Sequence, residues 1–265
     1  MKLCYRLRRV CGSVYTNGNL LFTPDGNNIL SPIGNRVTIF DLVQHICTTL
    51  PFECRKNIKR MALSHDGRFL IVVDVDGHAL FINFPRKVYI TSIILLITRL
   101  FIHLFIQVIL QRMNFKKKVY DIKFSPDDTH FAVTYGNGCQ IWKTPSIQRE
   151  FAPLILSRTL SGLHDASCCL DWSSDSNSLI IGSKDLTAKI FYRIKSKHMA
   201  STVLTGHRDK VVSAFFGSDD DTAYTVASDG AVFTWQFEYG DRVPITKKKK
   251  YNDDMEDEDE VEDDE

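Results

Sequence analysis

The chain has 265 residues, 44% of them hydrophobic and 25% charged, which are the values of a globular protein with a sizeable buried core. Its formal net charge of +1 hides a strong segregation, because residues 253–265 hold 11 acidic residues and no basic one. Without that segment, 33 Lys and Arg face 21 Asp and Glu, a surplus of 12 positive charges. Such a body suits a polyanionic partner, although its lysines could equally well solvate the edges of strands.

The motif content argues against catalysis and metal binding. Seven cysteines show no CxxC pair and no His/Cys metal spacing, so we expect reduced thiols, no metal and no cofactor. The first residues, MKLCYRLRRVCGS, lack an apolar stretch and predict no secretory signal. Glycine-rich phosphate loops, nucleophile elbows and paired carboxylates outside turns and the acidic segment are missing, so we expect no catalytic residue and no enzyme.

Five copies of one unit follow one another along the chain. One mark is the residue before a turn (TPDG, SHDG, SPDD, SSDS or GSDD), and it occurs at Phe22, Leu63, Phe124, Trp172 and Phe216. A second mark is the apolar residue that ends a later strand, and it occurs at Phe40, Ile82, Trp142, Phe191 and Trp235. Both marks repeat every 41 to 49 residues, apart from one step of 60 or 61 between copies two and three. A period of roughly 40–45 residues is typical of the four-stranded blades of a β-propeller.

The fifth copy, residues 206–235, carries the clearest signature. It runs from Gly-His through two strands to the turn Ser-Asp-Gly and a third strand that ends in Trp. This order resembles a WD repeat, in which a loop His, a strand hydroxyl, a turn Asp and a Trp share hydrogen bonds that brace the blade. We therefore predict such a network among His207, Thr225, Asp229 and Trp235, and prefer this structural interpretation to a catalytic or metal-binding one.

The same spacing recurs in other copies. In the fourth copy, Asp185 lies six residues before Phe191, and His164 stands in the loop ahead of them. The second copy keeps the turn residue as Asp76, and the third keeps the aromatic residue as Trp142. We predict these residues for the corresponding places in their blades.

The copies define the expected domain organisation. Residues 1–87 are predicted to form blades one and two, and residues 112–240 blades three to five, of an all-β, incomplete WD-repeat propeller. Strands are expected at Phe69–Val73, Ala79–Phe84, Leu179–Gly182 and Ala231–Trp235.

The surplus between copies two and three is an apolar insertion at residues 88–111. Within residues 88–110, 16 of 23 residues are Ile, Leu, Val or Phe. That length could span a bilayer, but a span would separate blades that must contact one another. We therefore predict an inserted helix that lies on the propeller and consider a membrane unlikely as a partner. The alternative is a membrane-associated WD-repeat adaptor, such as a trafficking coat subunit, that residues 88–110 anchor.

The last segment, residues 241–265, changes character. Four lysines precede a nearly continuous acidic run, and such a composition predicts disorder. The lysines are a candidate nuclear import signal or a solvated linker: Lys247, Lys248, Lys249 and Lys250.

Several segments narrow the family. The first 42 residues, REFAPLIL, LDWSSDS, GSKDLTAKIF and GHRDKVVSAFF, followed by the acidic run, resemble the periodic tryptophan protein 2 family in the same order. The resemblance covers residues 1–87 and 112–260. It implies two tandem WD propellers, a helical carboxyl-terminal region and a non-enzymatic role in the nucleolar small-subunit processome. It further implies, as partners, other WD-repeat processome proteins, pre-rRNA with its 5′ external spacer, and small nucleolar ribonucleoprotein, contacted directly or through partners.

The chain departs from that family pattern in two places. It contains the apolar insertion, and it stops before the first propeller closes. We therefore expect a truncated or mis-spliced product in which the insertion is a translated non-coding piece.

Overall fold

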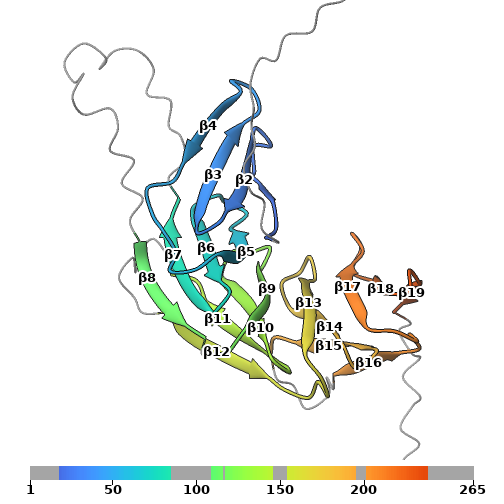
Figure 1. Cartoon of the computed structure of the whole chain (residues 1–265). Coiled ribbons are helices and arrows are strands. Elements are labelled where there is room, and N and C mark those ends of the chain that lie inside the picture. The colour runs from blue at the N-terminus through green and yellow to red at the C-terminus, as the bar shows by residue number, and fades with distance from the viewer. Residues whose placement is uncertain (1–17, 85–108, 116, 146–153, 195–200, 238–265) are drawn as a thin grey trace, which may run out of the picture.

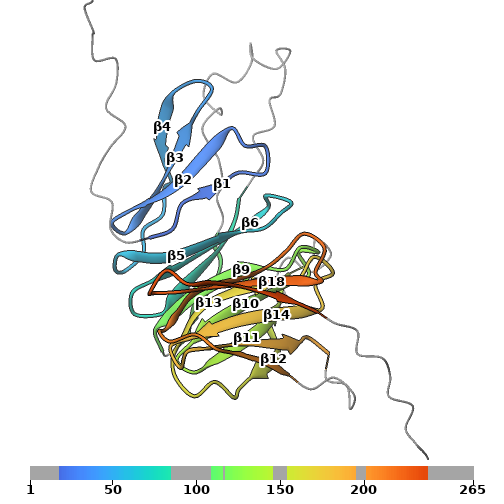
Figure 2. The ribbon, with the colours of Figure 1, turned by 90° about the vertical axis from the view of Figure 1, so that its right-hand side faces the viewer.

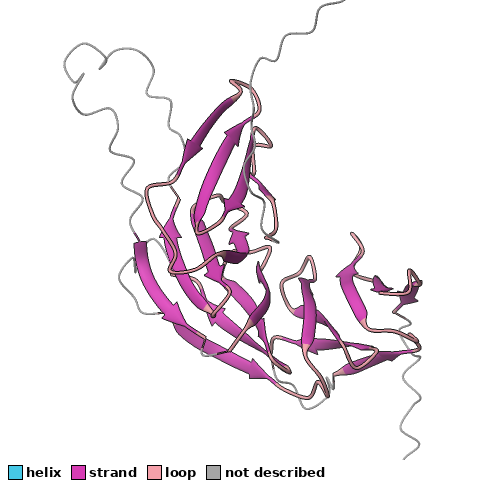
Figure 3. Ribbon diagram, in the orientation of Figure 1, coloured by secondary structure: helices cyan, strands magenta, loops and turns pink. Residues whose placement is uncertain are grey.

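A computed structural model describes residues 18–84, 109–115, 117–145, 154–194 and 201–237. Within these ranges the regular elements are all β-strands, and they form five antiparallel sheets (Figure 3). Each sheet is a meander in which consecutive strands pair. The predicted all-β class is confirmed for the described part of the chain.

The strands of the first two sheets follow the chain in order. The first sheet contains β1 (Leu21–Phe22), β2 (Asn28–Ile33), β3 (Arg36–Asp41) and β4 (Ile46–Thr49). The second sheet contains β5 (Ile58–Leu63), β6 (Phe69–Asp74), β7 (His78–Asn83) and β8 (Ile109–Asn114).

The remaining three sheets repeat this arrangement. The third contains β9 (Val119–Phe124), β10 (His130–Tyr135), β11 (Gly138–Lys143) and β12 (Ile155–Leu160). The fourth contains β13 (Ser167–Trp172), β14 (Ser178–Ser183), β15 (Thr187–Tyr192) and β16 (Thr202–Thr205). The fifth contains β17 (Val211–Phe216), β18 (Thr222–Ala227) and β19 (Val232–Gln236).

The sheets are arranged like the blades of a propeller. Figure 1 shows them along an open arc, with the sheet of β1–β4 at one end and that of β17–β19 at the other. In the side view of Figure 2, β5, β9 and β18 run nearly parallel across the picture. Strands β5, β9, β13 and β17 each begin a sheet and contact one another in turn, so we call them the inner strands.

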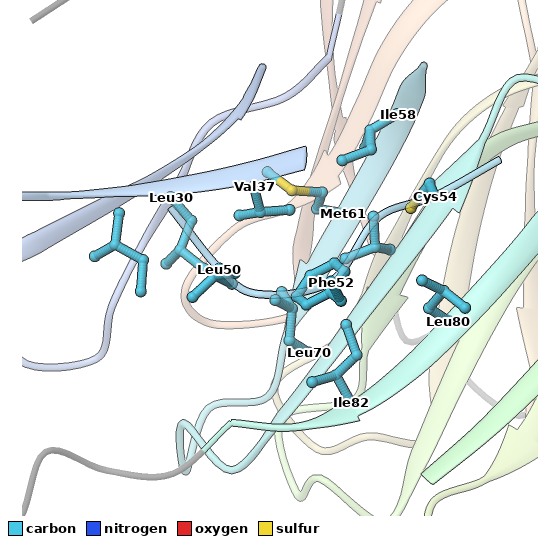
Figure 4. Close-up of a cluster of buried hydrophobic side chains, with 12 residues drawn as sticks. Leu30, Val37, Leu50, Phe52, Cys54, Ile58, Met61, Leu70, Leu80 and Ile82 are labelled. Carbon is cyan, nitrogen blue, oxygen red and sulfur yellow. The ribbon is translucent and has the colours of Figure 1, made fainter. Parts of the chain in front are cut away.

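The hydrophobic core lies between neighbouring sheets and not within a single one. Four clusters of buried side chains fill the four junctions. At the first junction, Leu30 from β2 and Met61 and Leu70 from the second sheet are completely buried, and Phe52 from the connecting segment lies among them (Figure 4). Each fully buried side chain of this size contributes about 1.5–3 kcal/mol, so neighbouring sheets stabilise one another.

The strands agree closely with the sequence pattern. The four ranges expected to be strands correspond to β6, β7, β14 and β19, and every observed boundary lies within one residue of the predicted one. Alternation of buried and half-buried side chains along β18, between turn residues on both sides, explains why this pattern could be predicted from the sequence.

The prediction of a helix at residues 88–111 is wrong for its last three residues, which form part of a strand. Ile109, Leu110 and Gln111 belong to β8, which pairs with β7 from His78↔Asn114 to Ile82↔Ile109 and completes the second sheet. The blade boundary therefore moves as well, since residues 112–114 belong to the second sheet and not to the third. The outer edge of β7 needs a hydrogen-bonding partner, and an apolar run serves as a strand as readily as a helix.

Other predictions fall outside the described residues. These are the structure of residues 88–108 and of the tail from residue 241 onwards. Among the residues that the structure describes, there is no helix that is long and apolar enough to cross a membrane.

The junction packing gives a direct test of stability. Leu179 is completely buried at the junction of the third and fourth sheets. Leu179→Ala should lower the free energy of unfolding by about 2–5 kcal/mol, because it removes apolar contacts and leaves a cavity. Denaturant unfolding measures this change. Val43→Ala, at a side chain that is 69% exposed, is the control and should change stability by less than about 0.5 kcal/mol.

Candidate functional site: a braced platform with two unlike rims

A buried hydrogen-bonded brace holds the fifth sheet. His207, in the loop before β17, places Nε2 2.6 Å from Thr225 Oγ1 on β18, and Trp235 Nε1 on β19 donates to the same oxygen at 2.8 Å. The His207 ring also stacks on Phe233, with centroids 4.2 Å apart. The structure thus brings together three of the predicted residues, and the brace fixes the loop against two strands.

The fourth predicted residue of this network, Asp229, lies elsewhere. It is exposed, and its carboxylate accepts the N–H of Ala231 at 3.0 Å within its own turn. His207 Nδ1 is buried and has no hydrogen-bond partner in the described part of the chain. The prediction that Asp229 joins His207 was wrong because the short turn uses the carboxylate to cap its own backbone.

In the fourth sheet, Asp185 meets His164 through the backbone. Its Oδ2 accepts the His164 N–H at 3.0 Å, and its Oδ1 accepts the N–H and hydroxyl of Thr187 at 3.1 and 2.6 Å. Burial raises the pKa of Asp185, but these hydrogen bonds outweigh it and hold the pKa below its usual value. The His164 side chain is exposed, and Phe191 is buried in the apolar core, so neither side chain joins a brace.

The second and third sheets use other residues. Asp76 is an exposed partner of Lys56 Nζ at 2.9 Å, whereas its neighbour Asp74 is completely buried and accepts the N–H groups of Asp76 and His78 at 3.0 and 2.9 Å. In the described part of the chain, Asp76 is thus joined to a lysine and Asp74 to the backbone of its own turn. Trp142 packs edge-on against Phe115, and its Nε1 is buried with no hydrogen-bond partner among the described residues.

Two aspartates that the sequence analysis missed join the inner strands. Asp121 on β9 accepts the Leu170 N–H of β13 at 3.2 Å, and Arg60 Nε of β5 lies 3.8 Å from its other oxygen. Burial raises the pKa of Asp121, against the hydrogen bond from Leu170 and the nearby cations. The arrangement therefore links three sheets through one carboxylate.

A second carboxylate joins the next pair of sheets in the same way. Asp171 on β13 accepts the Phe216 N–H of β17 at 3.2 Å and the ammonium of Lys123 on β9 at 2.8 Å. Each carboxylate receives a cation from the preceding sheet and an N–H from the following one. Such contacts fix the register between sheets that apolar packing alone would leave free to slide.

The turns that follow the inner strands form one rim of the arc. In the last three sheets the fourth residue of the turn reaches the turn of the preceding sheet: Asp128 accepts the N–H groups of His65 and Asp66 at 2.8 and 2.7 Å, and Ser176 Oγ accepts the Asp127 N–H at 3.1 Å. Asp220 accepts the N–H groups of the SSDS turn at 2.8 and 3.2 Å in the same way. These fourth residues have φ between 54 and 59°, a conformation that aims their side chains at the neighbouring turn.

The opposite rim, where the inner strands begin, is rich in cations. Its loops and the turn between β14 and β15 carry a set of basic residues that we call the basic rim: Arg55, Lys56, Lys59, Lys117, Lys118, Lys184, Arg208 and Lys210. The acidic side chains of the turns and the cations of this rim lie at opposite ends of the same strands. The rim of the turns is therefore acidic, whereas the basic rim carries its cations together with carboxylates such as Asp76, Asp165 and Asp185.

Comparisons with known proteins place these sheets in context. The family described as WD domain, G-beta repeat matches residues 156–191, which correspond to β12 through β15. Periodic tryptophan protein 2 of Saccharomyces cerevisiae is 40% identical over 240 residues, covering 89% of this chain and 24% of the relative. The resemblance to periodic tryptophan protein 2 is confirmed. The mouse homolog is 39% identical over 236 residues, and the Schizosaccharomyces pombe homolog 40% over 239.

The match covers only part of each relative. The chain spans about a quarter of the length of the periodic tryptophan protein 2 relatives named above.

The brace predicts a stability effect. Thr225→Val keeps the side-chain shape but leaves the Trp235 N–H and His207 Nε2 without their partner in a buried place. We expect a loss of about 1–3 kcal/mol in the free energy of unfolding. Thr234→Val, on the exposed side of β19, is the matched control and should be nearly neutral. An equal effect of the two substitutions would contradict a stabilising role for the brace.

The Asp185 contacts predict a dependence on pH. Because the folded-state pKa of Asp185 is lowered from its ordinary 3.8, its stabilisation is fully present above that pH and is lost as the pH falls through the lower, folded-state pKa. Asp185→Asn should therefore reduce stability at neutral pH and flatten the loss of stability on acidification. Urea unfolding at neutral pH and below 3.8 checks this. The same pH profile in the variant as in the unchanged chain would contradict it.

Proposed function

We propose that the chain acts as a non-enzymatic WD-repeat scaffold in ribosome biogenesis. The observation that carries this proposal is the identity of about 40% with periodic tryptophan protein 2 over 89% of the chain, together with the five-sheet arc in that region. The family resemblance implies work in the small-subunit processome, where pre-rRNA is processed and the small ribosomal subunit is assembled. We apply the role of the whole relatives to this chain, which spans about a quarter of their length.

The geometry supports a platform for assembly. The aspartates that bridge sheets, Asp121, Asp128, Asp171 and Asp220, engage backbone N–H groups of neighbouring sheets. They make the arc rigid, and a rigid arc offers extended rims to several partners at once without paying an ordering cost on binding. The polar chemistry described above thus serves structure, which is the ordinary use of WD repeats.

The partners that we propose follow from the two rims and from the family. Other WD-repeat processome proteins would dock on sheets and turns, and pre-rRNA and small nucleolar ribonucleoprotein would be contacted directly or through them. The proposed location is the nucleolus, reached with Lys247–Lys250 as the nuclear import signal.

Affinity purification of the tagged full chain tests this function. We expect processome proteins and pre-rRNA to copurify, and a fluorescent fusion to collect in nucleoli. Replacing Lys247–Lys250 with glutamines should shift the fusion towards the cytoplasm if those lysines direct import. Recovery of the chain with carbonate-washed membranes, without processome proteins, would instead support the membrane-associated adaptor and refute the scaffold.

A further inference from the structure

Two lysines from two sheets lie over one aromatic ring on the basic rim, and a third lysine is close enough for its charge to act on one of them. Lys59 Nζ, on β5, lies 4.7 Å from the ring centroid of Tyr120 on β9, and Lys184 Nζ, in the turn between β14 and β15, lies 5.8 Å from it. Lys118 immediately precedes β9, and its charge acts on Lys59. The ring face attracts both ammonium groups, so Tyr120 holds cations from two other sheets close together.

The lysines of this cluster lack acidic partners. No salt bridge in the described part of the chain joins Lys59, Lys118 or Lys184 to a carboxylate. Burial lowers the pKa of Lys59, and the charges of Arg60, Lys118 and Lys184 lower it further. Positive charge without a salt-bridge partner among the described residues is thus concentrated at this point of the rim, which favours binding of an anion.

The other charged groups nearby are already engaged. Arg60 turns inward, where its Nε donates to the carbonyl of Tyr120 at 2.9 Å and faces Asp121. Asp185 is occupied by His164 and Thr187, and Asp165 accepts the N–H of Ala166 at 2.6 Å. Among the described groups that contact Tyr120, the guanidinium of Arg60 is therefore directed inward, and the ammonium groups of Lys59 and Lys184 lie over the ring.

We propose that Lys59, Lys118 and Lys184, gathered around Tyr120, bind the backbone phosphates of RNA. Ammonium groups bind phosphate oxygens as point charges, whereas carboxylates of a protein partner are matched best by the two-pronged guanidinium of Arg. Closely spaced cations from three sheets suit a polymer whose charges follow one another at short intervals. The choice of RNA as the polymer rests on the proposed function in ribosome biogenesis.

Salt-dependent binding of a labelled single-stranded oligouridylate to the purified full chain tests the site. Each phosphate contact contributes about 0.7 to the slope of log affinity against log salt for single strands. The triple variant K59Q/K118Q/K184Q should therefore lower that slope by about 2 and weaken binding at low salt. Lys56→Gln is the matched control on the same rim, because Lys56 is already neutralised by Asp76, and it should leave the slope unchanged.

Substitutions of Tyr120 test whether its ring positions the lysines or whether their charge alone determines binding. Tyr120→Phe retains the ring face and should retain the affinity for the oligouridylate. Tyr120→Leu removes the ring without changing the charge, so the lysines are no longer held together and affinity should fall severalfold. Equal affinities of the two variants would overturn the role assigned to the ring.

Two further results would overturn the phosphate site. One is a triple variant, or the exposed pair K118Q/K184Q if the triple fails to fold, that keeps the wild-type slope. The other is a peptide of residues 253–265 that binds the cluster while the oligouridylate does not. If the oligouridylate does not bind, copurification of processome proteins is still expected. If the chain binds the oligouridylate but no processome proteins copurify with it, only the proposed function is refuted.

Discussion

Face-to-face packing between consecutive sheets is the constraint on which the rest of this structure depends. Each junction buries side chains from two sheets, such as Phe81 against Phe131 between the second and third, with ring centroids 6.1 Å apart. A single three- or four-stranded sheet has no core of its own, so contacts with the neighbouring sheets stabilise it, as in other repeat architectures. The rims that meet partners are consequences of this stacking, because the loops lie wherever the packed strands end.

Polar contacts determine how neighbouring sheets are placed against each other, which apolar packing alone does not. Asp121 and Asp171 reach from one inner strand to a backbone N–H of the next, and Asp128 and Asp220 reach from one turn to the preceding one. Partly buried carboxylates are costly unless they are hydrogen-bonded, so each favours one relative placement of two sheets. The links therefore determine the placement of each sheet against the next and keep the cations of the basic rim at fixed separations.

The sequence predicted the repeated sheet well and its polar details less well. Turns with Gly or Asp at the fourth position, and strands such as β14 between them, are local signals that need no tertiary knowledge. Residues Ile109–Gln111 were misassigned because an uninterrupted apolar run has no period that separates a helix from a strand. Asp121 was missed because its partners lie on other sheets, so no spacing within one repeat records them. Asp74 was missed because its partners are backbone N–H groups of its own turn, which a pattern of side-chain types does not record.

One glycine shows how closely the last two sheets approach. A Cβ atom added to Gly182 on β14 would lie 2.6 Å from Cys169 Sγ and 2.8 Å from Val211 Cγ1 of the fifth sheet. At most interior positions, shortening a side chain opens a void, but here even one methyl group would act as a wedge between the two layers. The close approach of the fifth sheet to β14 thus requires a residue without a side chain at this position, and a larger residue would force Cys169 and Val211 to move.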